Sequence, residues 1–415
     1  MSDARWIASL CLARAGFALM FVAYSASLGL LRHDWGLSSA QAGLIQSAFH
    51  LGYLVSLFAI GFLADRYGAK RTYLATSVAA CLSGLAFALF AQGFVSALLL
   101  HALTGLCSGG SYTPGLTLIA ERFPAERRGR AMGFYLAAAS LGYALSLWIS
   151  SLLIVASGWR AALIACALGP IAASAIGAWV LRATPNLVHR AAYANPLRAL
   201  TEVWRNRSAM LAVWAYVFHS WELLGMWAWM PTYLGVVLAH GRASNAGMAS
   251  LGIAYAALSY LISTAGSIGG GLLSDRWGRT AVILLMSIAS LACSFSFGWL
   301  IAAPVWLVVA VAIAYNLSAI GDSSVYSTAL TELVPAQRIG AAWALRSLLG
   351  FGAGAVSPWI FGLVLDLGQG AGGARSDAAW GWAWTVLGIG AMLGPLATLR
   401  LRALRESAQM AGGKR

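Results

Sequence analysis

Long apolar runs, separated by short charged or Pro/Gly-containing breaks, occupy most of the chain. Each of twelve runs is long enough to cross a bilayer, which requires about 20 apolar residues. The runs cover residues 6–31, 41–64, 72–93, 95–120, 131–156, 160–182, 208–239, 247–273, 280–301, 304–331, 339–366 and 380–401. We therefore expect an all-α integral membrane protein with twelve transmembrane helices joined by short loops.

Composition supports this fold class and excludes others. Of 415 residues, 60% are hydrophobic and 10% are charged, whereas a soluble domain carries roughly 25% charged residues. A water-soluble enzyme is excluded, and so little chain lies outside the runs that a large extramembrane catalytic domain is excluded as well. No H-E-x-x-H, C-x-x-C or G-x-S-x-G pattern occurs, so no enzyme active site, metal site or cofactor site is predicted.

The first apolar run has a competing interpretation as a cleaved signal peptide, because Arg5 precedes it. A secretory apolar region spans only about 7 to 15 residues, and this run is considerably longer. We therefore interpret it as a transmembrane helix.

Basic residues are distributed unevenly between the two sides of the predicted membrane. If the N-terminus is cytoplasmic, 21 Lys and Arg residues lie in cytoplasmic segments, and only Arg32, Arg160, Arg242 and Arg375 lie on the opposite side. This asymmetry follows the positive-inside rule and places both termini in the cytoplasm. The formal charge of +14 is thus a topology signal that requires no nucleic-acid partner. We expect a multi-pass protein of a cell membrane, in bacteria the inner membrane.

The chain also contains an internal repeat. Residues 61–70, here the first motif block (Gly-Phe-Leu-Ala-Asp-Arg-Tyr-Gly-Ala-Lys), recur 210 positions later as the second motif block, residues 271–280 (Gly-Leu-Leu-Ser-Asp-Arg-Trp-Gly-Arg-Thr). A second pattern, residues 121–129, recurs at 332–340, displaced by 211. We predict two six-helix halves in parallel orientation, residues 1–182 and 208–415. Residues 183–207 form a linker, with a short amphipathic helix over 195–204 on the cytoplasmic membrane surface.

These motif blocks and the duplication resemble the major facilitator superfamily of secondary transporters. The resemblance implies two six-helix bundles around a central cavity, lined by the first, fourth, seventh and tenth helices, whose rocking gives alternating access. It also implies a cytoplasmic gate, in which Asp65 and Asp275 pair with Arg127, Arg130 or Arg338. The alternative is that these charges only end helices and fix topology.

The glycines of the blocks have a physical role that needs no resemblance. Gly61 and Gly271 would let helices approach closely, while Gly68 and Gly278 would permit a tight turn with positive φ. The complete set of expected gate residues is Gly61, Asp65, Arg66, Gly68, Arg71, Glu121, Arg127, Asp275, Arg276, Gly278, Arg279, Glu332 and Arg338.

Ionisable residues inside the predicted spans are the best indicators of function, because each costs roughly 2.5 to 3.5 kcal/mol on insertion. They are Arg14, His50, His101, His219, Glu222, Asp322 and Arg346. We interpret His50 and His101 as core histidines. The formal charges fall on three of the four helices expected to line the cavity.

Arg14 lies roughly 12 Å into the first span, at a rise of 1.5 Å per residue. Phe17, Phe21 and Tyr24 share its helical face. A guanidinium offers a fixed fork of donors that suits a carboxylate, so we predict a substrate-binding site here. The alternative is an arginine that snorkels to the cytoplasmic interface.

Asp322 and Arg346 lie at similar depths on neighbouring helices, and we expect them to pair because either charge alone in low dielectric is costly. Tyr315 and Tyr326 share the face of Asp322, which suits either a cavity wall or simple packing.

Glu222 and His219 are three residues apart and so share a helical face. A buried carboxyl can exchange protons at physiological pH. We therefore predict proton coupling through Glu222 or Asp322, with His219 as the relay.

Together these residues predict a proton-coupled symporter of a small organic anion such as a carboxylate, with the bilayer, the solute and protons as its partners and a monomeric state. The four formal charges sum to zero, so a zwitterionic substrate stays open. The alternative function is a proton-driven efflux antiporter of amphipathic compounds. Drug-exporting relatives, however, carry an arginine where this chain has His101 and a proline-containing run absent from its fifth span. A receptor or membrane scaffold of the same fold is a third possibility.

Overall fold

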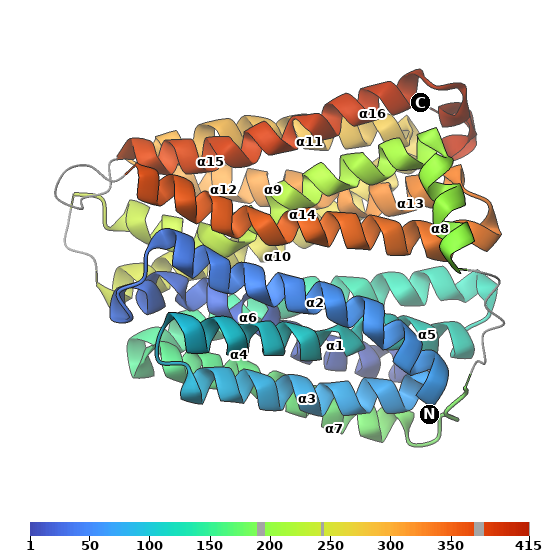
Figure 1. The fold of residues 1–415 in the computed structure, drawn as a ribbon, viewed down its shortest axis with the longest axis horizontal. Helices are drawn as coiled ribbons and strands as arrows, with labels where there is room; N and C mark the ends of the chain where they lie inside the picture. Colours follow the sequence, from blue (N-terminus) through green and yellow to red (C-terminus); the bar gives the residue numbers. More distant parts are fainter. Residues whose placement is uncertain (189–195, 242–244, 369–376, 415) are drawn as a thin grey trace. The chain divides into compact units, whose positions relative to one another are not determined.

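The computed structural model describes residues 1–188, 196–241, 245–368 and 377–414, and the secondary structure in these ranges is helical (Figure 1). The first half of the chain contains α1 (Asp3–Asp34), α2 (Ser39–Tyr67), α3 (Ala69–Phe90), α4 (Phe94–Ser108), η1 (Gly109–Ser111), α5 (Thr113–Arg122), α6 (Ala125–Ala167) and α7 (Gly169–Leu181). The second contains α8 (Pro196–Arg205), α9 (Arg207–Leu238), α10 (Ala246–Trp277), α11 (Arg279–Phe297), η2 (Gly298–Leu300), α12 (Val305–Gly321), α13 (Ser323–Leu333), η3 (Ala336–Arg338), α14 (Ile339–Leu367), α15 (Asp377–Ala391), α16 (Leu393–Ala403) and η4 (Arg405–Gly413).

Ten helical segments among the described residues are long and apolar enough to cross a membrane. One of them, residues 130–181, is 52 residues long, about twice the length that a single crossing requires. It bends at Gly158, whose φ of 80° is not helical. The Trp-rich α9, 32 residues long, is not among the ten. The protein is therefore an all-helical, multi-pass membrane protein, and the count of twelve stays a prediction.

The described residues form two compact units. Unit 1 contains residues 1–37, 44–188 and 245–257, and unit 2 contains residues 38–43, 196–241, 258–368 and 377–414. The first residues of α2 thus belong to unit 2. There Asp366, near the end of α14, accepts the backbone N–H groups of Ser39 and Ala40 at 2.8 and 2.7 Å. A carboxylate at this place satisfies two donors that a helix N-terminus leaves unpaired.

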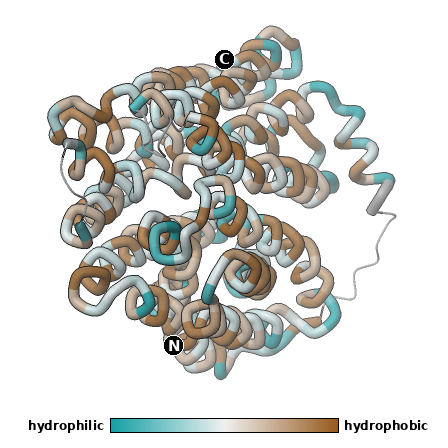
Figure 2. The backbone as a smooth tube through the Cα atoms, turned by 60° about the vertical axis from the view of Figure 1, so that its left-hand side comes forward, coloured by the Kyte–Doolittle hydropathy of each residue, from teal (hydrophilic) through white to brown (hydrophobic). Residues whose placement is uncertain are grey.

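Each unit has its own apolar core. The core of unit 1 contains Trp6, Tyr73 and Ile119, and that of unit 2 contains Val213 and Leu330. Hydrophobic residues prevail along the helices (Figure 2), and many large ones are exposed, such as Leu272, Trp306 and Leu367. Exposed apolar surface on long helices suits contact with lipid.

Each half contains an interrupted helix that carries polar residues at its break. In the first half, α4 ends at Ser108, η1 follows, and α5 starts at Thr113 with a proline in its first turn. In the second half, α12 ends at Gly321 and α13 starts at Ser323, so that Asp322 stands at the break. Breaks of this kind expose backbone polar groups, which membrane proteins tolerate only where protein or a cavity satisfies them.

The short helix α8 confirms the helix predicted in the linker, since it begins at Pro196 and ends at Arg205 (Figure 1). Val203 is buried in the core of unit 2, while Trp204 is exposed. Its location on a membrane surface stays a prediction. Asn195, the first residue of the predicted helix, and the basic residues Arg190, Arg242, Arg375 and Arg415 lie outside the described residues.

Candidate functional site

The break in unit 1 is bound by a buried arginine. Arg14, on α1, is 6% exposed, and its Nη1 donates a hydrogen bond to Ser111 Oγ at the end of η1. Arg14 Nε has no hydrogen-bond partner among the described residues. Arg14 also has no ion-pair partner there, so its charge is compensated only by neutral groups.

Tyrosines surround this guanidinium. The rings of Tyr112 and Tyr135 each lie 5.7 Å from the Arg14 Cζ atom, within the range of cation–π attraction. Tyr53 and Tyr143 are also close enough to interact with it electrostatically. Tyr135 Oη donates to the backbone oxygen of Ser111 at 2.5 Å, so one tyrosine contacts both the arginine and the helix break. The site can therefore hold a cation without a carboxylate of its own.

The aromatic residues predicted beside Arg14 have other contacts. Phe17 packs edge-on against Tyr73, with ring centroids 5.5 Å apart. Tyr24 packs against Phe87 and His101. Phe21 packs against Phe49, Tyr53 and Tyr143, and the last two also interact with Arg14. Phe21 is therefore connected to Arg14 through two tyrosines, and a substrate-binding role of the three aromatic residues stays a prediction. The tyrosines that do contact it come from α2, α6 and the break itself.

The break in unit 2 carries an acid instead. Asp322 is 1% exposed, and its Oδ1 lies 3.0 Å from Nδ1 of His219 on α9. The other imidazole nitrogen of His219 lies 2.8 Å from Ser323 Oγ, the next residue of the break. His219 therefore bridges two consecutive residues at the point where the helix is interrupted.

The predicted pair between Asp322 and Arg346 is wrong. The Nη1 atom of Arg346, on α14, donates to Ser327 Oγ at 2.5 Å, and its guanidinium lies over the Tyr216 ring at 4.3 Å. Depth along a helix axis placed both residues correctly in the buried interior, but the rotation of each helix gave Asp322 a different partner. Arg346, like Arg14, has no ion-pair partner among the described residues.

Glu222 forms a second acidic group in unit 2. It is 4% exposed, and its Oε2 accepts a hydrogen bond from Ser290 Oγ of α11 at 2.6 Å. Tyr315 is fully buried, packs against Phe297 and Trp384 and also interacts with Glu222; its predicted place beside the substrate stays a prediction. Tyr326 is equally buried, and its ring lies 5.3 Å from that of His219.

The two breaks correspond in sequence. Ser111 and Asp322 are 211 positions apart, and so are Tyr135 and Arg346. This is the displacement of the second repeated pattern. Sequence reasoning missed Ser111 and its tyrosines because neutral residues carry no insertion cost that would attract attention. The polar stretch Ser111–Thr113 after two glycines in an apolar span, read at this displacement, could have indicated them.

His50 and His101 are confirmed as core residues of unit 1. The imidazole of His101 lies 4.7 to 4.8 Å from the ring centroids of Tyr24, Phe49 and Phe87. His50 Nε2 lies 3.0 Å from Nε2 of Gln46, one turn away. Within the described part of the chain, no group of three or more His, Cys, Asp or Glu residues could hold a metal ion.

The motif blocks form tight turns, as predicted from their second glycines. Gly68 and Gly278 have φ values of 89° and 96°, which only glycine adopts readily. The predicted close helix approach is wrong for the first glycines. Within its own unit, a Cβ at Gly61 would meet no atom within 4 Å, and at Gly271 only Ser324 Oγ at 3.8 Å.

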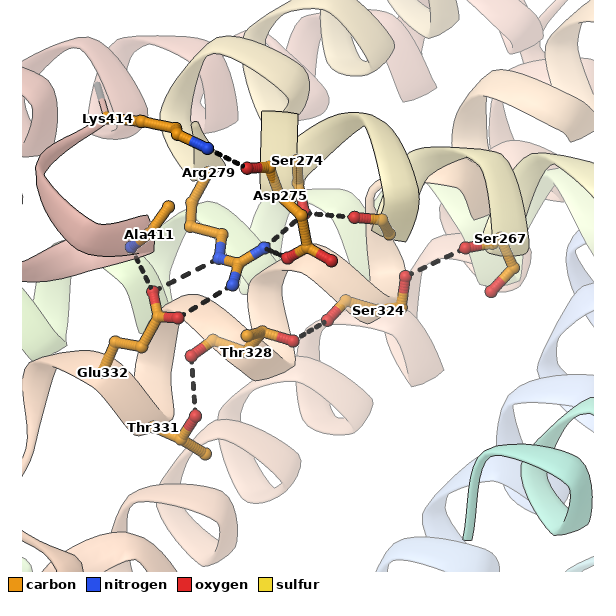
Figure 3. Close-up of polar contacts among 11 residues, drawn as sticks. Ser267, Ser274, Asp275, Arg279, Ser324, Thr328, Thr331, Glu332, Ala411 and Lys414 are labelled. Atoms are coloured by element: carbon orange, nitrogen blue, oxygen red, sulfur yellow. Dashed lines mark hydrogen bonds and ion pairs between the residues drawn. The ribbon is translucent and has the colours of Figure 1, made fainter. Parts of the chain in front are cut away.

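The second motif block contains a cluster of charges (Figure 3). Arg279 donates from Nη1 to Asp275 Oδ1 at 2.5 Å and to Ser274 Oγ at 2.7 Å. It also donates two hydrogen bonds to Glu332 of α13, from Nη2 to Oε1 at 2.9 Å and from Nε to Oε2 at 3.2 Å. Arg338, expected to pair with Asp275, instead pairs with Glu202 of α8 at 2.6 Å. Arg279 is the cation that holds Asp275 and Glu332.

The first motif block lacks the arginine that binds the two acids in the second block. Its counterpart of Arg279 is Ala69, 210 positions earlier, which is buried. Lys70 Nζ donates to the backbone oxygen of Thr184 at 2.9 Å, and the backbone N–H of Arg71 donates to Asn186 Oδ1 at 3.2 Å. The turn of the first block is therefore contacted by backbone and amide groups of residues 184–186.

The other predicted gate residues lie near the same turns. Arg66 stacks over Tyr67 at 5.3 Å, and Arg127 and Arg276 are exposed. Asp65 and Glu121 are partly buried at the corresponding places of the first half. The gating role of these residues stays a prediction.

An all-helical multi-pass chain with an internal repeat, buried charges at two interrupted helices and a motif turn in each half defines a secondary transporter rather than an enzyme. The family description of the Major Facilitator Superfamily matches residues 9–395. The chain belongs to this superfamily.

Individual relatives agree with that assignment. The hexuronate transporter of Bacillus subtilis is 24% identical over 361 residues, covering 83% of each chain. A probable sulfoacetate transporter of Cupriavidus necator is 25% identical over 382 residues, covering 84% of this chain and 85% of the relative. Among solved structures, a bacterial homolog of the human lysosomal transporter Spinster superposes with a TM-score of 0.77 at 15% identity, covering 100% of this chain and 99% of that one. The last similarity shows the fold alone.

Proposed function

We propose that this transporter carries a small organic anion with a carboxylate group, together with protons, by alternating access. The observation that carries the proposal is the pair of buried arginines, Arg14 and Arg346, neither of which has an ion-pair partner among the described residues. An uncompensated buried charge is costly. An anionic substrate would supply the missing counter-charge.

Arg14 is the better anion site of the two. Its Nη1 is fixed by Ser111, and its Nε is free to donate. The rings of Tyr112 and Tyr135 restrict its rotation. A guanidinium held in this way presents a fork that matches the two oxygens of a carboxylate. The relatives named for hexuronate and sulfoacetate support the same substrate class, since both compounds carry a carboxylate.

Proton coupling is assigned to unit 2. His219 and Asp322 form a buried imidazole–carboxylate contact, with Ser323 on the other ring nitrogen. Protonation of Asp322 would remove the charge that attracts His219, and such a change at a helix break can alter the position of α13. Glu222, whose carboxylate accepts a hydrogen bond from Ser290 Oγ, is the second candidate proton acceptor.

Transport by the purified protein in proteoliposomes tests this proposal. The assay measures uptake of D-glucuronate and of sulfoacetate at equal pH and with the outside more acidic. D-Glucose is the matched control, because it differs from glucuronate by replacement of the carboxylate with a hydroxymethyl group. We expect acid-stimulated accumulation of at least one acid and no uptake of glucose.

Three other outcomes would contradict the proposal in different ways. Uptake of glucose at the same rate would eliminate the anion site, while uptake indifferent to the pH gradient would eliminate proton coupling. Extrusion of a lipophilic dye from loaded vesicles, with no uptake of either acid, would favour the efflux antiporter, to which the aromatic residues of α9 are also suited.

A further inference from the structure

In each unit, the segment that follows the helix α7 or α16 returns to the motif block of that same unit. We call residues 182–188 the linker strap and residues 404–414 the C-terminal strap. We infer that the two straps position their motif turns and so determine how far each turn can move during transport. The inference goes beyond the substrate and the coupling ion, and it requires only that the chain is a transporter.

The linker strap contacts the turn around Gly68. The Nδ2 atom of Asn186 donates to the backbone oxygen of Tyr67 at 2.8 Å, and its Oδ1 accepts the backbone N–H of Arg71 at 3.2 Å. One amide side chain thus pairs with backbone groups on both sides of the turn. A Cβ at Gly68 would collide with that amide, so glycine is required here for the docking as well as for the positive φ.

The C-terminal strap contacts the second motif block through different groups (Figure 3). The backbone N–H of Ala411 donates to Glu332 Oε2 at 3.1 Å, and Lys414 Nζ donates to the backbone oxygen of Asp275 at 2.7 Å. Glu332 and Asp275 are the two acids that Arg279 holds. The strap therefore contacts the same two residues that Arg279 binds, Asp275 at the turn and Glu332 on α13.

Two observations show that this docking is specific. Met410 is fully buried in the core of unit 2, and Ser407 is fully buried beside it. The chain then reverses through Ala411, Gly412 and Gly413, with φ values of 51°, 65° and 94°. A non-glycine residue at positive φ is strained and persists where the surroundings compensate for it. The strained Ala411 is the residue whose N–H reaches Glu332.

The straps also explain how two motif blocks with different residues can form the same turn. The second block holds its acids with Arg279 and adds the C-terminal strap, whereas the first has Ala69 at that position and relies on Asn186 and on Lys70 bound to Thr184. Each turn is thus contacted by the strap of its own unit, but through different groups.

Hydrogen–deuterium exchange of the full-length protein in nanodiscs tests the inference. Lys414→Met removes the donor to Asp275 at a solvent-accessible position, and Lys414→Arg is the matched control that keeps a donor. Asn186→Ala is the corresponding change in unit 1. We expect Lys414→Met to speed exchange roughly fivefold in residues 274–282 and to leave residues 64–72 unchanged, because local opening depends on local contacts. Asn186→Ala should show the reverse pattern, and Lys414→Arg should match wild type.

A second pair of variants addresses the strained residue. Ala411→Pro removes the N–H that reaches Glu332 and also forbids the positive φ of this residue, so it breaks the docking of the strap; Ala411→Gly keeps both the N–H and the positive φ and relieves only the strain. Only the proline variant should speed exchange in residues 274–282. Unchanged exchange in that segment in both Lys414→Met and Ala411→Pro, or equal acceleration in the two motif turns, would overturn the inference.

Uptake separates positioning from mere structural support. Lys414→Met should change the maximal rate of D-glucuronate uptake by about threefold while its KM stays that of wild type, because a positioning contact acts on motion and not on substrate binding. A changed KM with an unchanged maximal rate would contradict the inference. If wild type transports neither D-glucuronate nor sulfoacetate, the proposed function fails, and the exchange experiment still decides whether the straps hold the turns.

Discussion

The interrupted helices of the two units solve the same structural problem with opposite charges. In unit 1 the break presents Ser111, a neutral residue held by the cation Arg14. In unit 2 the equivalent position is Asp322, an acid held by His219. The duplicated scaffold has kept the break and changed its chemistry. The break of unit 1 therefore contacts a buried cation, and the break of unit 2 contains a buried imidazole–carboxylate contact.

The second arginine shows the same exchange of roles. Tyr135 of unit 1 and Arg346 of unit 2 occupy positions 211 residues apart. In unit 1, the tyrosine contacts the break directly and the cation comes from α1. In unit 2, the cation comes from α14, where Arg346 lies over the ring of Tyr216 on α9. An aromatic ring and a cation are thus paired in both units, but they come from opposite helices.

The largest effect should come from removing the cation of unit 1. Arg14→Gln keeps a polar side chain but loses the charge and the fork. Substrate affinity should fall roughly a hundredfold, because a charge-assisted pair contributes about 3 kcal/mol and each 1.4 kcal/mol is tenfold. The measurement is the KM of D-glucuronate uptake. Arg14→Lys, which keeps the charge without the fork, should lie between Gln and wild type. A wild-type KM in Arg14→Gln would show that the uncompensated cation is not the anion site.

Placing an acid at the break of unit 1, as unit 2 has at Asp322, should have the next largest effect. Ser111→Asp places at the first break the residue type found at the second, and the new carboxylate would pair with Arg14. Because the cation is then neutralised, the KM for D-glucuronate should rise about thirtyfold.

Ser111→Asn is the matched control, since it adds similar volume without charge, and its KM should stay within about threefold of wild type. Equal effects of Asp and Asn would assign the loss to packing at the break and would remove charge from the comparison.

Much of this arrangement could be predicted from the sequence. Arg14, Glu222, Asp322 and Arg346 stand out because a charge in a span is expensive, and each is buried in the structure. The fold class and the superfamily follow from apolar run lengths and two repeated motif blocks. These properties depend on composition and spacing along the chain, which a sequence states directly.

The partners of these residues could not be predicted in the same way. Asp322 contacts His219 and not Arg346, because depth within a span does not specify how a helix is rotated about its axis. The neutral partners Ser111, Tyr112 and Tyr135 could not be recognised in the sequence, because serine and tyrosine cost little free energy inside a helical bundle. The straps were missed because their contacts use backbone groups and one amide, which leave no charge pattern.

The acid of unit 2 should matter for coupling more than for binding. Asp322→Asn keeps the size of the side chain and removes its carboxylate, the group that would bind the proton. Accumulation driven by a pH gradient should fall about tenfold, because the substrate would no longer be tied to a proton, while exchange of internal for external D-glucuronate continues. Both are measured in the same proteoliposomes.

Ser323→Ala, which removes only the second contact of His219, is the control for local packing and should retain gradient-driven accumulation. If Asp322→Asn loses exchange as well as accumulation, Asp322 belongs to the substrate site. The assignment of substrate binding to the first break and proton coupling to the second would then be wrong.

The smallest effect should come from the motif blocks. Arg279→Ala gives the second block the residue that the first already has at Ala69, and it removes the bonds to Asp275 and Glu332. Arg279 is buried but its partners are partly exposed, so the loss should be about 1 to 2 kcal/mol of stability and a two- to fourfold lower uptake rate. Thermal unfolding in detergent and D-glucuronate uptake measure the two effects, and Arg279→Lys should restore part of each.

The first block forms its turn with an alanine at this position and the linker strap in place, so the C-terminal strap should hold the second turn when its arginine is absent. Combining Arg279→Ala with Lys414→Met removes both supports, and the loss of uptake should exceed the product of the two single effects, because contacts that share one turn are not independent. If the loss of uptake in the double variant equals the product of the two single losses, Arg279 and the C-terminal strap stabilise the turn independently. The strap would then not compensate for a missing arginine, and the comparison between the two blocks would fail.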